Sequence, residues 1–105
     1  MDIVKEVYRL TAVLPTEEKY GLSSQMKRCA VSIPSNIAEG SCKKSPKHQA
    51  HFIEIAIGST FELETQLLIC IENALILKDD AKPLLTLIEE EQKMTYAYQQ
   101  RLTND

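Results

Sequence analysis

The chain has 105 residues, of which 44% are apolar and 26% charged, and its net charge is −3. This composition is typical of one soluble globular domain spanning residues 1–105, and it is too rich in apolar residues for a disordered chain. No stretch approaches the roughly 20 apolar residues of a membrane span, and the N-terminus lacks a secretory signal pattern, so a cytoplasmic protein with no membrane contact is predicted.

The charges are distributed unevenly along the chain. Residues 1–51 contain eight Lys or Arg and five Asp or Glu, whereas residues 52–105 contain four Lys or Arg and ten Asp or Glu. Because both halves belong to one small domain, we expect a basic surface and an acidic surface to coexist on the folded protein.

Apolar residues at steps of three and four predict a short amphipathic helix over residues 2–13, which ends before Pro15. A helix of this length depends on packing for its stability, so we expect it to dock on its neighbours. Thr16 is the expected N-cap of the next helix, with Glu17 and Glu18 in the first turn, where the helix dipole favours negative charge.

The stretch YGLSSQMKRCAVSIPSNIAEG, residues 20–40, carries the most informative pattern of the chain. Its apolar residues recur at helical spacing and predict one buried face, formed by Leu22, Met26, Cys29, Ala30, Ile33 and Ile37. The pattern keeps its phase across Pro34, which predicts a helix that bends but continues. Gly40 is expected to end this helix, because glycine tolerates the positive φ that is common at helix ends.

A polar stripe runs beside the apolar face at the same spacing. It consists of Gln25, Arg28, Ser32 and Asn36, with Glu39 one turn further on. Two interpretations of this stripe remain open. The side chains could form a polar network that satisfies backbone groups near the proline, or they could contact a ligand or a partner.

A long helix is predicted from Pro46 to Leu77, with Ser45 as its N-cap. One apolar stripe contains Phe52, Ile55, Ala56, Ser59, Leu63, Gln66, Leu67, Cys70, Ala74 and Leu77, and a second contains Ile53, Ile57, Phe61, Leu68, Ile71 and Leu75. An apolar arc this wide favours self-association. Gly58, in the middle of the helix, indicates a close approach by another helix.

Asp79 or Asp80 is the expected N-cap of the last helix, which places Pro83 in its first turn and runs to about Thr103. The chain shows no strand-like alternation, and the joints between the helical segments are short. The sequence therefore predicts an all-α fold, an antiparallel up-down-up-down four-helix bundle whose first helix is short.

Residues 20–40 closely resemble the signature of the 23S rRNA-intervening sequence proteins, a family of bacterial four-helix bundles. The signature positions in this chain are Gln25, Arg28, Ser32, Pro34, Asn36, Glu39 and Gly40. The resemblance continues through the Ser-rich and Lys-rich joint of residues 41–47 into FIEIAIGSTFELETQLLI, and it covers nearly the whole chain. Family members usually have a longer first helix, so by this resemblance roughly the first half of that helix is missing here or the start codon is misplaced.

Related four-helix bundles include the accessory variability determinants of diversity-generating retroelements. These resemble ring-shaped pentamers that bind nucleic acid and a reverse transcriptase. The resemblance therefore implies a homo-oligomer, with a pentamer as the expected form, and a partner that is RNA, DNA or another protein.

Six basic residues are the candidate nucleic-acid contacts: Lys19, Lys27, Arg28, Lys43, Lys44 and Lys47. In an oligomer these cations multiply, and additive phosphate contacts dominate nucleic-acid affinity. Few aromatic residues lie near them in the sequence, so sequence-specific reading of single strands is not expected. The alternative is a structural or protein-interaction scaffold whose basic residues are only solvated surface.

No pattern typical of catalysis is present, because the chain lacks a phosphate-binding loop and a nucleophile elbow. His48, His51 and Glu54 share a helical face, but exposed polar residues at the start of a helix are the favoured interpretation. Cys29 and Cys70 fit buried thiols. We therefore predict neither an enzyme nor a metal or cofactor site.

Overall fold

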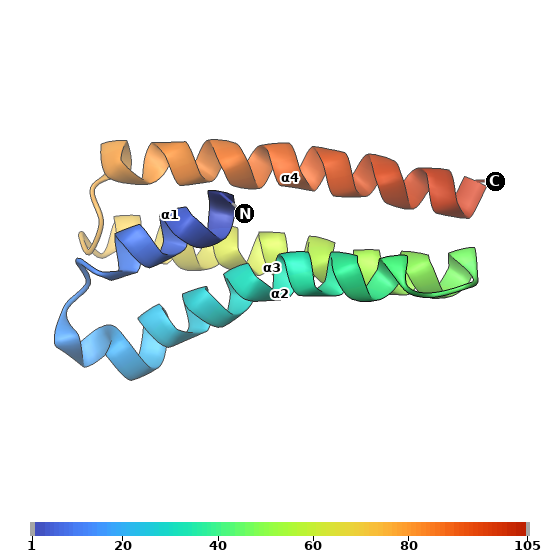
Figure 1. Cartoon of the computed structure of the whole chain (residues 1–105). Helices are drawn as coiled ribbons and strands as arrows, with labels where there is room; N and C mark the ends of the chain where they lie inside the picture. The colour runs from blue at the N-terminus through green and yellow to red at the C-terminus, as the bar shows by residue number, and fades with distance from the viewer. Residues whose placement is uncertain (1, 105) are drawn as a thin grey trace.

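The computed structural model of the chain describes residues 2–104, and Figure 1 shows four α-helices that run alternately in opposite directions. They are α1 (Asp2–Thr11), α2 (Ser24–Ser41), α3 (Pro46–Glu72) and α4 (Lys78–Asn104). These residues contain no β-strand. The predicted all-α fold, an antiparallel bundle of four helices whose first helix is shorter than the others, is confirmed.

The unequal helix lengths shape the bundle. Both α1 and α3 pack on α2 and α4. Because α1 has 10 residues and α4 has 27, α1 accompanies α4 along only part of its length (Figure 1). One end of the bundle is therefore built from four helices, and the other end from α2, α3 and α4.

The core lies where all four helices meet. Ile3, Val7 and Leu10 of α1 are buried there. The remaining buried members of this core are Leu14, Met26, Cys29, Ala30, Ile33, Leu63, Leu67, Cys70, Ile76, Ala81, Leu84 and Ile88. The predicted apolar face of residues 20–40 is confirmed, since its members are either buried in this core or packed against it.

The entry into α2 differs from the prediction. The residues Thr16–Glu18 form a 3₁₀ turn that Pro15 precedes, so Thr16 lies inside a turn and is not the N-cap of the long helix. A π-helical turn, Lys19–Ser23, follows before α2 begins. Gly21, a poor helix former, lies in this wide turn, and the regular pattern is reached only after it.

α2 is continuous through Pro34, as predicted, and it changes direction between its two halves in Figure 1. The predicted role of Gly40 is wrong, because no glycine in residues 2–104 has a positive φ and the helix continues through Gly40. A Cβ at Gly40 would lie 3.1 Å from Phe52 Cβ and 3.2 Å from the Gln49 carbonyl oxygen. Gly40 therefore allows α2 and α3 to approach closely beside the joint that connects them.

The predicted start of α3 at Pro46 is confirmed, but the predicted end at Leu77 is wrong. Ser45 is the N-cap, since its hydroxyl accepts a hydrogen bond of 3.1 Å from the His48 N–H, and Pro46 is the first helical residue. The helix ends at Glu72, five residues before the predicted end, because Ala74 adopts a φ of 56°. The N–H groups of Ala74 and Leu75 then bond to the Ile71 and Cys70 carbonyls, which is a Schellman motif with alanine at the left-handed position.

The two apolar stripes of α3 differ in burial. Most of the first stripe is buried, including Leu63 and Leu67, although Ile55 is exposed. The second stripe divides, since Ile53 is buried while Phe61 and Leu68 are exposed. The predicted close approach at Gly58 is not found within the described chain, where a Cβ at this residue would meet no atom within 4 Å.

The last helix begins two or three residues earlier than predicted, at Lys78. Asp79 and Asp80 lie in the first turn of α4, so neither is its N-cap. The Leu77 carbonyl instead accepts hydrogen bonds from the N–H groups of Asp80 and Ala81. Leu84, Ile88 and Thr95 are buried at the predicted helical spacing. Within residues 2–104, no helix is both long and apolar enough to span a bilayer.

Candidate nucleic-acid interface

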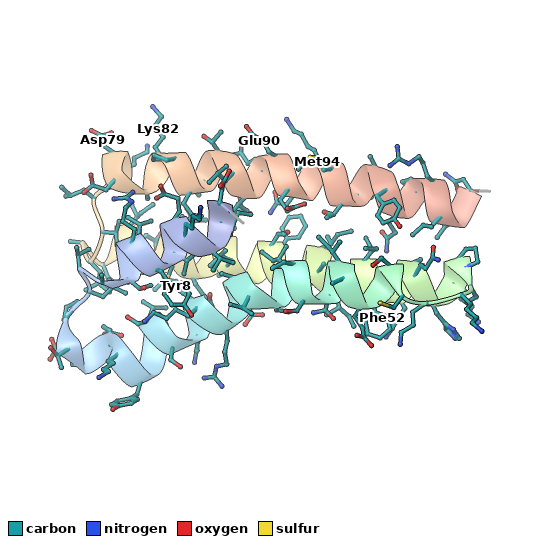
Figure 2. All side chains as sticks on the ribbon, in the orientation of Figure 1. Tyr8, Phe52, Asp79, Lys82, Glu90 and Met94 are labelled. Atoms are coloured by element: carbon teal, nitrogen blue, oxygen red, sulfur yellow. The ribbon has the colours of Figure 1, made fainter. Side chains whose placement is uncertain are left out.

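A surface hollow of about 400 Å³ lies between α1 and the beginning of α2. Its lining residues are Tyr8, Lys19, Tyr20, Ser24, Lys27, Arg28 and Val31, and we call it the basic hollow. Tyr8 comes from α1, at its junction with α2 in Figure 2. Three of the six predicted basic residues thus meet in one place.

Local structure explains how these side chains converge. Lys27 and Arg28 lie in the first two turns of α2, whereas Lys19 and Tyr20 belong to the π-helical turn before it. Each lysine lies beside a tyrosine ring: Lys27 Nζ is 5.1 Å from the ring centre of Tyr8, and Lys19 Nζ is 5.5 Å from that of Tyr20. These are cation–π distances.

The basic hollow keeps its positive charge. The ion pairs found within residues 2–104 join Arg9 to Glu6 and Lys43 to Glu39, so none involves the three cations of the basic hollow. Arg28 is exposed and donates a hydrogen bond of 3.3 Å to the hydroxyl of Ser24. A neutral partner leaves the guanidinium charge available to an anion.

The other three predicted basic residues lie elsewhere. Lys43, Lys44 and Lys47 belong to the α2–α3 joint and the first turn of α3, at the opposite end of α2. Because α2 has 18 residues and a helix rises about 1.5 Å per residue, the two groups lie towards opposite ends of a helix roughly 27 Å long. Lys43 is paired with Glu39 at 3.1 Å and lies 5.0 Å from the ring centre of Phe52. The six cations therefore form two groups.

The polar stripe of the signature also divides into two parts. Asn36 Nδ2 donates to the carbonyl and to the hydroxyl oxygen of Ser32, at 2.9 Å each, and the Ser32 hydroxyl lies 2.9 Å from that of Ser59 on α3. For these residues the interpretation as a structural network is the one observed. Gln25 and Arg28 instead face a second hollow of about 410 Å³, which they share with Cys29, Ser32, Ser59 and Glu62.

The remaining signature residues, Pro34, Glu39 and Gly40, lie outside the basic hollow. Pro34 lies inside α2, Gly40 permits the close α2–α3 contact, and Glu39 pairs with Lys43. Arg28 lines both hollows and lies between them. It is the one signature position that also belongs to the basic hollow.

The thiol beside the second hollow is not a nucleophile at neutral pH. Burial, together with the nearby Glu62 carboxylate, raises the pKa of Cys29 to about 12, so the thiol stays protonated. Its Sγ donates to the Ser59 carbonyl oxygen at 3.0 Å. Cys70 is also buried and its pKa is raised by burial, whereas Cys42 is exposed. Residues 2–104 contain no group of three or more His, Cys, Asp or Glu placed to hold a metal ion.

The aromatic residues of the basic hollow were not predicted from the sequence. Few aromatic residues lie near the cations in the sequence, but the structure places Tyr8 and Tyr20 among them. Tyr20 could have been found, because it directly follows Lys19. Tyr8 could not, since it belongs to another helix and reaches α2 only through packing.

The fold and this surface define a class of protein: a small all-α four-helix bundle with a basic, aromatic hollow at one end. The family comparison is more specific, because the 23S rRNA-intervening sequence protein family matches residues 1–97. The chain belongs to this family. No curated protein matches it significantly.

Proposed function

We propose that this protein is a non-catalytic, self-associating bundle that binds nucleic acid, RNA or DNA, through the basic hollow. One observation carries the proposal: Lys19, Lys27 and Arg28 converge on a single surface without a carboxylate partner. The residues that line the basic hollow include no Asp or Glu, and Glu62 lines only the second hollow, which Arg28 also borders. The description of the family names ribosomal RNA, which agrees with an association with RNA.

The strength of such binding follows from counterion release. Each phosphate that a cation neutralises contributes about 0.9 to the slope of log affinity against log salt concentration for duplex DNA, and about 0.7 for a single strand. Three cations in one chain give a weak site. Several copies in an assembly would add their slopes, which is how a small bundle could bind firmly near physiological salt.

Self-association is the second part of the proposal. Phe61 and Leu68 on α3 and Tyr96 on α4 are large exposed apolar side chains. Phe61 and Tyr96 also border an apolar hollow of about 260 Å³ between α3 and α4. Exposed apolar patches of this kind are typical of protein interfaces. We propose that a second copy covers this face, and the resemblance to ring-shaped relatives suggests five copies.

Binding is tested by measuring affinity for a structured RNA and for duplex DNA over a range of salt concentrations. Lys19→Glu, Lys27→Glu and Arg28→Glu should each weaken binding about equally across sequences and lower the salt slope by about 1. Lys82→Glu is the matched control, since it makes the same charge change on α4, on a side chain that points away from the other helices (Figure 2).

A second set of variants tests the three predicted basic residues that lie outside the basic hollow. Lys43→Glu, Lys44→Glu and Lys47→Glu should have smaller effects than the three changes in the basic hollow, because these residues lie at the other end of α2 and Lys43 already has a carboxylate partner. If all six changes are as harmless as Lys82→Glu, or if nothing binds near physiological salt, the nucleic-acid proposal is wrong. A protein-interaction scaffold would then be the better description.

Self-association is tested by light scattering after size exclusion. Leu68→Glu should weaken the assembly, because it places a charge in the proposed interface. Thr86→Glu is the control, since Thr86 is an exposed polar residue of α4. A wild-type protein that remains monomeric at micromolar concentration would overturn this part of the proposal.

A further inference from the structure

We infer that the basic hollow takes single-stranded nucleic acid, with unpaired bases stacked on Tyr20 and Tyr8 and phosphates held by Lys19, Lys27 and Arg28. This inference rests on the proposed function and narrows its ligand class. It concerns stacking, which every base can provide, and it requires no reading of sequence.

The exposure of the two tyrosines has no explanation within the fold. Tyr20 is 87% exposed, on the irregular turn before α2, and Tyr8 is 49% exposed on α1. Neither belongs to the core cluster. Both nevertheless line the same concavity, together with three cations. Aromatic side chains beside a positively charged groove are the arrangement that single-strand-binding proteins use.

A duplex could not use this arrangement fully. Its base faces are stacked inside the helix, so it presents phosphates to the lysines and nothing to the tyrosine rings. A single strand presents both groups at alternating positions along the chain. The tyrosines therefore distinguish between ligands that the cations alone would bind alike.

The lysines that lie beside the rings do not prevent stacking. An exposed cation–π contact is worth about 0.5–1 kcal/mol, whereas stacking of a base on an aromatic side chain is worth about 1–3 kcal/mol. A phosphate beside the ring also attracts the displaced ammonium group. A base can therefore replace Lys19 on the ring of Tyr20, or Lys27 on the ring of Tyr8, while the displaced ammonium group binds a phosphate. This exchange is favourable.

The test compares oligo(U) and oligo(dT) of roughly 12 nucleotides, within the usual site sizes, with a duplex of the same length. Affinity is measured by fluorescence anisotropy with the intact protein. Tyr20→Leu should weaken single-strand binding about fivefold or more, leave the duplex within about twofold, and leave the salt slope unchanged because no charge is lost. Tyr20→Phe keeps the ring and should restore binding.

Two matched measurements complete the design. Tyr98→Leu removes another tyrosine with a cation beside its ring, on α4 and outside both the basic hollow and the proposed interface, and should change nothing in single-strand affinity. Because the chain has four tyrosines and no tryptophan, its intrinsic fluorescence reports the rings directly. Single strands should quench it, and Tyr20→Leu should remove much of that quenching.

The outcomes separate this inference from the proposed function. If the Lys19, Lys27 and Arg28 changes weaken binding but Tyr20→Leu and Tyr8→Leu do not, phosphate binding stands and stacking is wrong. Equal affinity for duplex and single strand also overturns the inference. If neither the charge changes nor the tyrosine changes matter, both proposals fail. Unequal affinity for oligo(U) and oligo(dT) in the wild type, combined with Tyr20 dependence, supports the inference, and oligo(dU) then separates the effect of the sugar from that of the thymine methyl group.

Discussion

The hydroxyl oxygens of Ser32 on α2 and Ser59 on α3 lie 2.9 Å apart, at the centre of a hydrogen-bonded chain that joins the two helices. Ser59 Oγ is also 3.2 Å from the Ile55 carbonyl oxygen, to which it can only donate. Because each hydroxyl has one hydrogen, Ser32 must then donate to Ser59, and Ser32 Oγ accepts from Asn36 Nδ2. The number of hydroxyl hydrogens therefore fixes the donor and the acceptor of each hydrogen bond in this network.

Breaking this chain should destabilise the fold. Ser32→Ala removes one of the two acceptors of Asn36 Nδ2 and the hydroxyl that donates to Ser59, so we expect a loss of about 1–2 kcal/mol in the free energy of unfolding. Ser59→Ala should cost a similar amount, because it leaves the Ser32 hydroxyl without its acceptor. Urea unfolding of both single variants and the double variant checks this, and purely additive effects would show that the two hydroxyls do not interact.

A second prediction concerns the end of α3. Ala74 has a φ of 56°, a left-handed conformation that costs roughly 1–2 kcal/mol for a residue with a Cβ. Ala74→Gly should therefore raise the unfolding temperature, although the greater freedom of glycine in the unfolded chain offsets part of the gain. Ala97→Gly is the matched control, since Ala97 is exposed inside α4 and should lose about 1 kcal/mol. Two changes of the same sign would contradict this account.

The end of α3 also shows why part of the fold was not predictable from the sequence. The four helices and most core positions follow from apolar spacing, because burial of one helix face requires that spacing. The apolar pattern, however, continues through Ala74 to Leu77, and alanine is the best helix former. Nothing local marks Ala74 as the left-handed residue, whereas Ile76, two residues later, is buried in the core.

The candidate site was predictable to a similar extent. Lys27 and Arg28 were found because they lie next to each other on a helix whose phase was clear. The separation of Lys43 from them follows from helix length, which the sequence also contained. The contribution of Tyr8 depends on how α1 sits against α2, and a pattern within one helix carries no information about that.

A third prediction uses pH. Glu91 lines a hollow of about 230 Å³ with apolar neighbours that include Ile33, Leu87 and Met94. Burial raises the pKa of Glu91 above its ordinary value, so folding favours the protonated form. Its contribution to stability is therefore fully present at a pH below the ordinary glutamate value and is lost as the pH rises through the raised value.

Glu91→Gln should accordingly stabilise the protein at neutral pH and give little or no gain at roughly pH 3, where both the folded and unfolded carboxyl groups are protonated. The stability difference between variant and wild type is measured by urea unfolding across that range. Glu89→Gln removes the same charge from an exposed site of α4 and serves as the control. A gain that is the same at every pH would show that burial of the charge is not its cause.

The last prediction compares two helix glycines whose surroundings differ. Gly40→Ala would bring a Cβ to 3.1 Å from Phe52 Cβ and 3.2 Å from the Gln49 carbonyl oxygen, neither of which is the end of a flexible side chain. Overpacking costs about 1–3 kcal/mol, more than the gain of about 1 kcal/mol in helix propensity. The variant should be less stable than the wild type, by urea unfolding.

Gly58→Ala should have the opposite effect on folding. A Cβ there meets no atom within 4 Å in the described chain, so the monomer should gain about 0.5–1 kcal/mol from the better helix former. Gly58 lies on the same helix as the exposed Phe61 and Leu68, so a second copy on this face could approach it closely. In that case the same substitution should stabilise the monomer but weaken the assembly, as measured by light scattering at several protein concentrations. If both stability and assembly improve, Gly58 is not at the interface.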